Sequence, residues 1–290
     1  MIEEDEEKIK KTSLFMTTFK RLSRNKLAVA GMIITILLVL MAVFAPRIMP
    51  YDYDKANFLN VLAKPNKDFV FGTDDLGRDI LSRMIYGSRY SLQIGFYSVG
   101  AACVFGIILG AIAGYFGGWV GDVIMRILDI FQAIPGMVMA IAISAVLGPG
   151  FGKCILALMI SMIPSFARMM RASILNVRKM EYLEAATSIN CSSFRIIRRH
   201  VLPNAMSPII VQATMSVPMS ILIAATLSYV GLGVQPPVPE WGAMLSAGRG
   251  YIRDYPHLVI FPGLIIMITV LSLNVFGDGL RDALDPKLKD

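Results

Sequence analysis

A glycine-rich stretch from Gly148 to Cys154 contains the residue types that come nearest to a nucleotide site. A phosphate-binding loop needs the pattern GxxxxGK followed by Ser or Thr, because backbone amides wrap the phosphates and the hydroxyl binds magnesium. Here the spacing is one residue short, and Cys154 stands where the hydroxyl is required. The stretch therefore predicts a tight turn between two helices, without an ATP site.

The histidines and cysteines do not form a catalytic or metal-binding set. His200 and His257 fall on opposite sides of the bilayer in the topology that the apolar segments indicate, so an active site built from both is excluded. Cys103, Cys154 and Cys191 form no CxxC or Cys/His cluster and predict unpaired thiols. We therefore expect no catalytic residue, no metal site and no bound cofactor.

Ion-driven transport would require an ionisable residue deep inside an apolar span, because the ion must bind where access alternates. The central parts of the apolar stretches contain none. Asp129 and Gln132 lie near one end of the third stretch, where they predict a polar contact inside the helix bundle. The sequence indicates no ion relay and no channel filter.

Six apolar stretches must position all of these residues. The chain has 290 residues, of which 55% are hydrophobic and 17% charged, whereas about a quarter are charged in soluble domains. A helix needs about 20 apolar residues to cross the hydrocarbon, and continuously apolar segments favour helices over barrel strands. We expect an all-α polytopic membrane protein with six transmembrane helices. They are predicted within residues 27–45, 90–120, 130–152, 151–167, 201–239 and 255–277.

The positions of Lys and Arg indicate how the chain is oriented. Most of them lie before Leu27, between Arg168 and Arg199, or after Gly277, which places both termini in the cytoplasm. Because the basic residues follow the topology, the formal net charge of +7 predicts no nucleic-acid partner. The lipid bilayer is the expected surrounding, and residues 27–48 are predicted to be an uncleaved anchor.

Glycine and proline predict how the spans pack and bend. Three glycines recur every four residues in the second span and predict close helix packing: Gly106, Gly110 and Gly114. Three prolines remove helix hydrogen bonds inside later spans and can bend or hinge them: Pro135, Pro164 and Pro218. The prolines of residues 236–239 are expected to stop the fifth span, and Trp241 is expected at the membrane interface.

The largest cytoplasmic loop, residues 168–204, is the best candidate for contact with another protein. Tyr182, Leu183 and Ala186 have spacings that place them on one helical face, which predicts a short protruding helix. Asn190 can end that helix in a left-handed conformation. A basic interfacial loop without a partner is the open alternative. A chain that can bend but has no energy source implies an energised partner.

One pattern in this loop has a fixed spacing, namely Glu184-Ala185-Ala186, then Asn190, then Leu202-Pro203-Asn204. It resembles the EAA motif of membrane subunits of ABC importers. Further segments resemble the C-type permease of dipeptide, oligopeptide and nickel importers, and together they span Leu27 to Pro286: Phe71–Asp79, Arg126–Gly136, Gly231–Pro237 and Trp241–Met244. Asn190 replaces the family's usual glycine, at a cost of about 1 kcal/mol, and His200 replaces a hydrophobic residue.

The resemblance implies a type I ABC importer permease fold and a non-catalytic subunit that forms half of a translocation pathway. It implies partners of three kinds: a second homologous permease, two ATP-binding subunits that bind ATP and magnesium, and an extracytoplasmic solute-binding protein. The residues implied in coupling to the ATPase are Tyr182, Leu183, Glu184, Ala185, Ala186, Asn190, Leu202, Pro203 and Asn204. Those implied in contact with an extracytoplasmic partner, or in a local ion-paired cap, are Thr73, Asp74, Asp75, Arg78 and Asp79.

The resemblance favours short peptides as the solute, with nickel or another small solute as the alternative. An ATP-independent secondary transporter, a channel and a scaffold are the other classes left open. The expected location is a bacterial or archaeal inner membrane. The expected divisions are a cytoplasmic tail (1–26), an anchor (27–48), an extracytoplasmic segment (49–89), a permease domain (90–277) and a cytoplasmic tail (278–290).

Overall fold

The computed structural model describes residues 20–181, 183 and 191–284. Within these ranges the regular structure is helical apart from an isolated bridge between Thr73 and Asp79, which confirms the all-α prediction. Five helices are long and apolar enough to span a membrane, and α9 is preceded by a π-helical turn, η2 (Ile197–Val201). They are α2 (Lys26–Ile48), α3 (Ile80–Phe116), α6 (Phe151–Val177), α9 (Leu202–Tyr229) and α11 (His257–Leu284).

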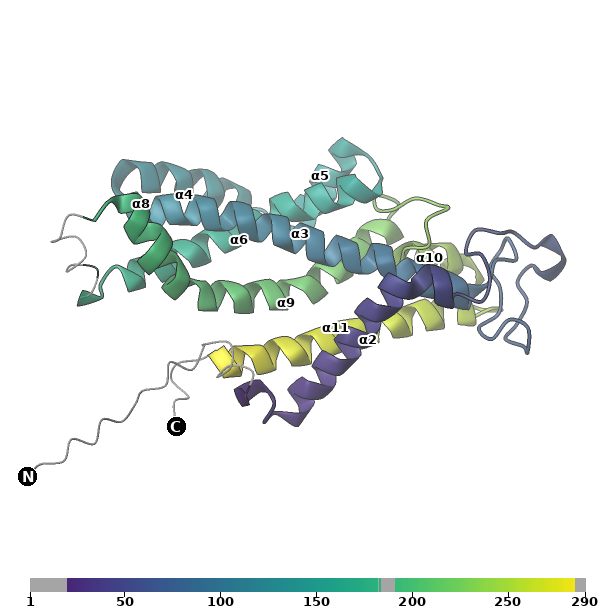
Figure 1. Cartoon of the computed structure of the whole chain (residues 1–290). Coiled ribbons are helices and arrows are strands. Elements are labelled where there is room, and N and C mark those ends of the chain that lie inside the picture. The colour runs from purple at the N-terminus through teal and green to yellow at the C-terminus, as the bar shows by residue number, and fades with distance from the viewer. Residues whose placement is uncertain (1–19, 182, 184–190, 285–290) are drawn as a thin grey trace, which may run out of the picture.

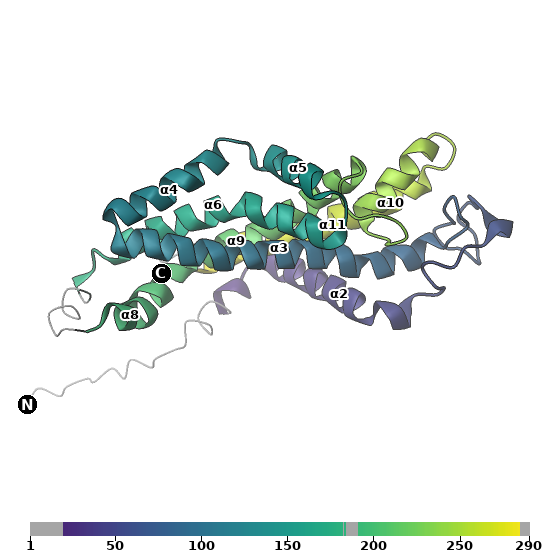
Figure 2. The same cartoon turned by 90° about the horizontal axis from the view of Figure 1, so that it is seen from above.

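The sixth candidate span, which is the third in order along the chain, is a broken helix. α4 (Gly118–Gln132) and α5 (Gly136–Leu147) meet at an angle of 84°, and Figure 2 shows the break between them. Pro135 directly precedes α5; it has no N–H and disfavours a helical conformation at Ile134. The expected start of the third span was therefore wrong, because the segment begins at Gly118 rather than within residues 130–152, whereas the bend expected at Pro135 is confirmed. α6 and α9 continue through Pro164 and Pro218.

α3 begins well before the apolar stretch that predicted it. Its N-cap is Asp79, whose side chain accepts a hydrogen bond from the Ser82 amide at 2.8 Å. The first turns bury the polar residues Ser82, Arg83 and Ser88. The sequence-based prediction placed the start of this helix near Tyr90, because a hydropathy scale treats these polar side chains as unsuited to a membrane span. In the structure Ser82 bonds Asp79 and the Tyr51 amide, and Arg83 donates to the Tyr53 carbonyl. Ser88 donates to the Ile85 carbonyl of its own helix.

The three-glycine repeat is the seam along which α3 packs against α6. A Cβ atom at Gly110 would lie 2.7 Å from the Cβ of Met170, and one at Gly114 would lie 3.1 Å from the Cβ of Ile174. At Gly106 it would overlap Phe166. The helices approach closely because these positions have no side chain, which confirms the predicted packing role.

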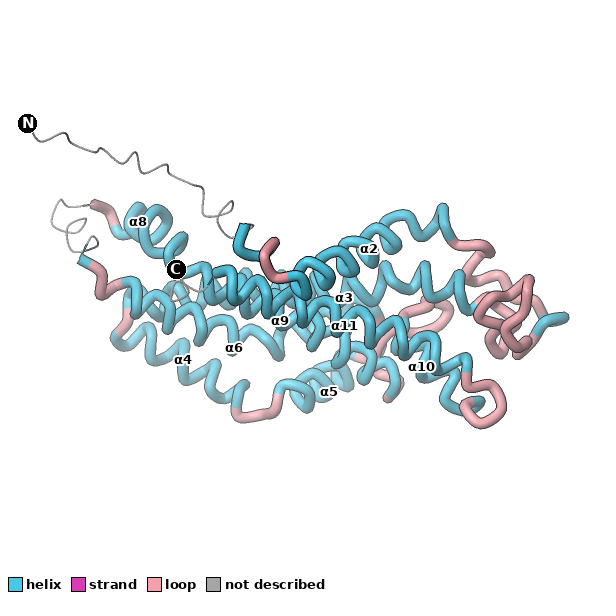
Figure 3. Tube along the Cα trace, turned by 90° about the horizontal axis from the view of Figure 1, so that it is seen from below, coloured by secondary structure: helices cyan, strands magenta, loops and turns pink. Residues whose placement is uncertain are grey.

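The spanning helices run roughly along one long axis, with the connections mainly at its two ends (Figures 1 and 3). Residues 49–79, with the short helix η1 (Phe58–Asn60), lie at one end together with α10 (Trp241–Gly248) and η3 (Arg249–Tyr251). We call this the 49–79 end. The opposite end, called the 178–201 end, holds the start of α4, the short helix α8 (Ser193–Ile196) and η2. α2 begins and α11 ends on this same side (Figure 1).

The end of α9 and the position of Trp241 differ from expectation. α9 stops at Tyr229, before the prolines, because Gly231 adopts a φ of 83° and the Leu232 amide donates to the Leu227 carbonyl at 2.8 Å. Trp241 is fully buried rather than interfacial. Its indole N–H donates to the Met84 carbonyl at 3.0 Å, so it fastens α10 to α3.

Candidate functional site

Arg178 anchors the start of the candidate coupling loop. α6 continues to Val177, so residues 168–177 are helical and the connection begins at Arg178. The Arg178 guanidinium donates to the carbonyls of Gly114 (3.2 Å) and Tyr115 (2.9 Å) and lies 5.8 Å from the Tyr115 ring centroid. These carbonyls belong to the last turn of α3, where a cation is favoured. Sequence reasoning missed this role, because it ended the span at residue 167 and did not place Arg178 directly after the helix.

A buried apolar cluster joins the two sides of this connection. Val177, Leu183, Ile196 and Val201 all belong to the main core cluster, and Leu183 is 6% exposed. The Leu183 amide donates to the Met180 carbonyl at 3.0 Å. The ends of the segment are therefore held by the same hydrophobic core.

The return into the membrane passes through the π-helical turn η2. The Leu202 amide donates to the Ile197 carbonyl, which is the spacing of a π-helix. Leu202 is partly buried, whereas Pro203 and Asn204 are exposed in the first turn of α9. The Asn204 amide donates to the His200 carbonyl at 2.7 Å. The predicted residues Tyr182, Glu184, Ala185, Ala186 and Asn190 lie outside the described residues.

Two ion pairs fasten the half-helix α4 to α6. Arg168 reaches Asp129 at 2.6 Å, and Arg171 reaches Asp122 at 3.6 Å. The Asp129 side chain is 58% exposed, so the predicted polar contact inside the bundle is instead a surface contact. Such pairs contribute about 0–1 kcal/mol each, so they orient α4 more than they stabilise it.

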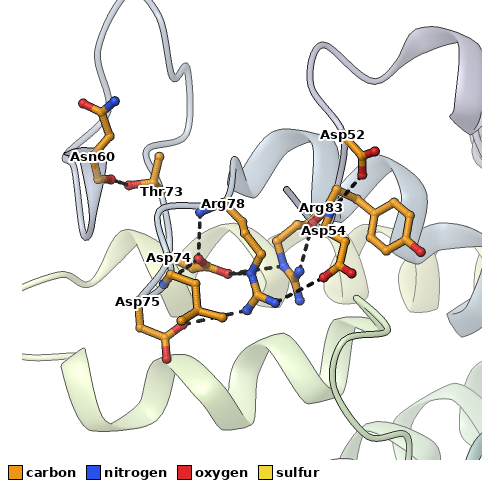
Figure 4. A network of polar contacts seen from close by, with 10 residues as sticks. Asp52, Asp54, Asn60, Thr73, Asp74, Asp75, Arg78 and Arg83 are labelled. Carbon is orange, nitrogen blue, oxygen red and sulfur yellow. Dashed lines mark hydrogen bonds and ion pairs between the residues drawn. The ribbon is translucent and has the colours of Figure 1, made fainter. Parts of the chain in front are cut away.

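At the opposite end of the molecule, Asp74 and Arg78 form the centre of a buried polar network (Figure 4). The Asp74 carboxylate accepts from the Arg78 amide at 2.9 Å and from the Arg78 Nε at 2.8 Å. Arg83, from the first turns of α3, also lies 3.4 Å from the same carboxylate. Arg78 further approaches Asp54 (3.7 Å) and Asp75 (3.9 Å). Most of the charge is thus paired within the chain.

The remaining predicted residues of this segment hold the loop in place. Thr73 accepts from the Ala63 amide at 2.8 Å and donates to the Asn60 carbonyl. Asp79 accepts from the Ser82 hydroxyl at 2.6 Å. Thr73 and Asp79 are almost fully buried, whereas the side chain of Asp75 is 39% exposed. The geometry is that of a local ion-paired cap, and contact with a partner protein stays a prediction.

Arg83 and Tyr53 are members of this region that sequence reasoning missed. The Arg83 guanidinium donates to the Tyr53 carbonyl at 3.0 Å. The Tyr53 ring stacks on Tyr86 at a centroid distance of 4.0 Å. Burial, and secondarily the neighbouring Tyr86 and Tyr90, raises the pKa of the Tyr53 hydroxyl. Tyr53 therefore acts as a neutral packing residue at physiological pH.

Glu240 joins α10 to α3 at the 49–79 end. It is 1% exposed and accepts from the amides of Gly242 (2.9 Å) and Ala243 (2.8 Å). Ser91 donates to Glu240 at 3.3 Å and accepts from the Trp241 amide at 3.1 Å. The carboxylate is therefore an internal helix cap, satisfied by groups of both helices.

The glycine-rich stretch is a turn, as predicted. Gly148 and Gly150 have φ values of 77° and 143°, and α6 begins at Phe151. The Gly150 amide donates to the Gly233 carbonyl at 2.9 Å, and Cys154 is buried inside α6. Within the described part of the chain, no three His, Cys, Asp or Glu residues are grouped as they would be around a metal ion.

Two family profiles match the chain. The family described as "binding-protein-dependent transport system inner membrane component" matches residues 106–290. The family described as "N-terminal TM domain of oligopeptide transport permease C" matches residues 13–65.

Curated proteins similar to the chain are transport permeases of nearly the same length. The dipeptide transport system permease protein DppC of Alkalihalophilus pseudofirmus is 48% identical over 271 residues, covering 93% of this chain and 89% of that protein. The glutathione transport system permease protein GsiD of Pectobacterium atrosepticum is 44% identical, covering 93% and 90%. The oligopeptide transport system permease protein OppC of Bacillus subtilis is 43% identical, covering 98% and 94%.

Solved structures with the same fold are more distant in sequence. A chain of the MetNI methionine ABC transporter in an inward-facing conformation aligns with a TM-score of 0.56 at 20% identity, covering 70% of this chain and 96% of that one. A chain of an amino acid ABC transporter solved with histidines aligns with a TM-score of 0.53 at 16% identity, covering 69% and 92%. At these identities the likeness supports the fold alone.

Proposed function

The chain belongs to the family of binding-protein-dependent transport system inner membrane components, and from that membership we propose that it carries short peptides across the membrane as half of an ATP-driven importer. As a member it is a non-catalytic, multi-pass permease subunit of the inner membrane. The observation that supports short peptides as the solute is the 48% identity with a dipeptide permease. Relatives named for glutathione and oligopeptides support the same class, since glutathione is itself a tripeptide.

The proposal includes a complex in which this chain supplies no energy. It pairs with a second permease, two cytoplasmic subunits bind ATP and magnesium, and an extracytoplasmic protein delivers the solute. Both termini lie in the cytoplasm, as the distribution of basic residues indicates. The 178–201 end then faces the ATPase, and the 49–79 end faces the delivery protein.

The loop from Tyr182 to Asn190 is proposed to couple the chain to the ATPase. Its EAA-like residues are Glu184, Ala185 and Ala186. Support comes from Arg178, which precedes the loop and is bonded to the end of α3, and from Leu183 within it, which is packed in the main core with Val201. A displacement of the loop would therefore be transmitted to α3, α6 and α9 through these packed and hydrogen-bonded contacts.

The solute is tested by uptake into vesicles that contain the assembled transporter, its delivery protein and internal ATP. We expect ATP-dependent uptake of trialanine or reduced glutathione. Uptake of Ni²⁺ alone would replace the peptide proposal with the metal alternative. Uptake that persists without ATP would instead indicate a secondary transporter.

The coupling assignment is tested by Glu184→Lys. We expect a normal amount of protein in the membrane but at least about a tenfold loss of ATP-dependent uptake, because a charge-assisted contact of about 1.5–3 kcal/mol becomes a repulsion. Glu181→Lys is the matched control, since Glu181 is exposed and three residues away. Undiminished uptake by the Glu184 variant would refute the docking role.

A further inference from the structure

An open groove lies between α5, α6 and α9, beside the break in the third span. Its volume is about 360 Å³, and Gly136 and Met137 at the start of α5 line its edge. The groove is notable because it is the meeting point of a bent helix with two continuous ones. None of the residues that line the groove belongs to the local ion-paired cap or to the candidate coupling loop.

Four polar side chains face this groove from apolar helices: Ser161, Ser165, Gln212 and Ser216. The Ser161 and Ser216 hydroxyls donate to carbonyls of their own helices at 2.8 and 2.7 Å, which leaves their oxygens able to accept. The Gln212 amide and the Ser165 hydroxyl make no hydrogen bond to any other described residue. Polar side chains in a membrane span are costly when they face lipid, so they indicate a hydrated passage.

Methionines supply much of the remaining lining: Met137, Met162, Met215 and Met219. Methionine is flexible and polarisable, so it adapts to partners of varied shape. A wall of methionines with a few amide and hydroxyl groups suits a ligand whose main chain is constant and whose side chains vary. A short peptide has this chemistry.

The groove continues toward the 178–201 end. A second cavity of about 370 Å³ shares Gln212 and Met215 with the first and extends to Ser207 and Arg281. The two cavities thus adjoin along α9. Arg281 lies at the C-terminal end of α11, so among the described residues the only charge lining the combined groove is at its far end.

The break between α4 and α5 also favours water in the groove. The first internal hydrogen bond of α5 runs from the Met139 amide to the Pro135 carbonyl, and α5 has no side-chain cap. Unpaired backbone groups at membrane depth are tolerated where they line a water-filled cavity. Residues 131–138 are exposed in the chain.

A cavity between α2 and α3 offers less to a solute. Its polar lining is Arg89, Gln93 and the amphipathic Tyr97, and Arg89 is already engaged with the Tyr86 ring at 5.5 Å. The α2 side of it is apolar, formed by Val39, Ala42 and Val43. Lipid or another apolar helix is the better match for that surface.

We propose that the groove lined by α5, α6 and α9 is this chain's share of the peptide pathway, with Gln212 and Ser165 bonding the peptide main chain and the methionines accommodating its side chains. The inference rests on the proposed import function. Peptides move from the bent region of the third span toward Arg281 along the face of α9.

Cysteine accessibility in the assembled transporter tests this assignment. The native cysteines are first removed by Cys103→Ser, Cys154→Ala and Cys191→Ser. Single cysteines are then introduced by Ser165→Cys or Ser216→Cys and reacted with a cationic methanethiosulfonate that does not enter lipid. We expect both to react at least about tenfold faster than Ile210→Cys, because only a hydrated thiol forms the reactive thiolate. Ile210 is the control because it is exposed on α9 but lines neither cavity.

Binding is tested in the same vesicles by Gln212→Leu. We expect trialanine uptake to fall about tenfold, the effect of losing one or two hydrogen bonds, while Ile210→Leu leaves uptake unchanged. If the groove cysteines are as unreactive as the control in vesicles that still import trialanine, the groove is not part of the peptide pathway, and the proposed function stands. Lipid or the second permease would then cover the groove. Absence of ATP-dependent uptake with the unaltered chain would overturn the proposed function itself.

Discussion

Single residues in this protein act mainly through buried, paired charge. Asp74 receives hydrogen bonds from two backbone amides and from the Arg78 side chain, and Arg83 lies beside it. Removing one partner of a buried pair leaves the other charge without compensation. The neighbouring Asp75 differs because its side chain is 39% exposed and its distance to Arg78 is 3.9 Å.

The pair Asp74→Asn and Asp75→Asn separates these two cases. We expect Asp74→Asn to destabilise the purified protein by about 3 kcal/mol, since two arginines lose a buried counter-charge. Asp75→Asn should change the unfolding free energy by less than about 1 kcal/mol. Thermal unfolding in detergent measures both. Equal effects would mean that the network does not hold the 49–79 segment.

The sequence identified Thr73, Asp74, Asp75, Arg78 and Asp79 as a group, because they lie in a segment that resembles the C-type permease. It could not identify Arg83 as their neighbour, nor Glu240 as the partner of Ser91. Arg83 belongs to a helix whose start hydropathy misplaced, and Glu240 meets Ser91 across 149 positions of sequence. Local patterns do not encode such distant pairing without knowledge of the fold.

At the scale of helices, the contact between α3 and α6 depends on the absence of side chains. Gly110 faces the Ala167 carbonyl and Met170, whereas a Cβ atom added at Gly100 on the same helix would have no other atom within 4 Å. Packing therefore leaves no room for a side chain at Gly110, whereas Gly100 has room for one.

Alanine at the two glycines should therefore have opposite effects. Gly110→Ala is expected to destabilise the protein by roughly 1–3 kcal/mol through overpacking. Gly100→Ala should be neutral or stabilising by up to about 1 kcal/mol, because alanine is the better helix former. The melting temperatures of the two variants in the same detergent provide the comparison. A loss of stability at Gly100 equal to that at Gly110 would contradict the packing argument.

Helix number was predictable and helix shape was not. Apolar length alone located the five continuous spans, since each must be long enough to cross the bilayer. Pro135, Pro164 and Pro218 were all predicted as possible bends, and the sequence could not tell which of them breaks its helix: α6 and α9 continue past Pro164 and Pro218. Whether a proline breaks a helix depends on the partners that neighbouring elements offer its free backbone groups.

At the scale of the whole molecule, the chain has two ends with different construction. The 49–79 end is held by a buried ionic network and by Glu240, and the 178–201 end by Arg178 and an apolar cluster. Between them lies the groove beside the bent span. This arrangement fits a pathway that joins two surfaces contacted by different proteins.

The whole chain is expected to be inactive alone. Reconstituted into liposomes without ATPase subunits, it should give no uptake of trialanine above that of empty liposomes, because in the proposed complex the ATP-binding subunits supply the energy. Adding the partner subunits with ATP should restore uptake. Measurable uptake by the chain alone would refute the division of labour.

The bonds between α3 and α10 also affect how the protein is made. Ser91 and the Met84 carbonyl obtain their partners from Glu240 and Trp241, which a ribosome adds 149 and 157 residues later. Until residues 240 and 241 are made, the Ser91 hydroxyl lacks its Glu240 and Trp241 partners and the Met84 carbonyl lacks its indole bond. We therefore expect chains that stall before Trp241 to leave the first turns of α3 without these contacts, and to be cut by proteases more readily than full-length chains.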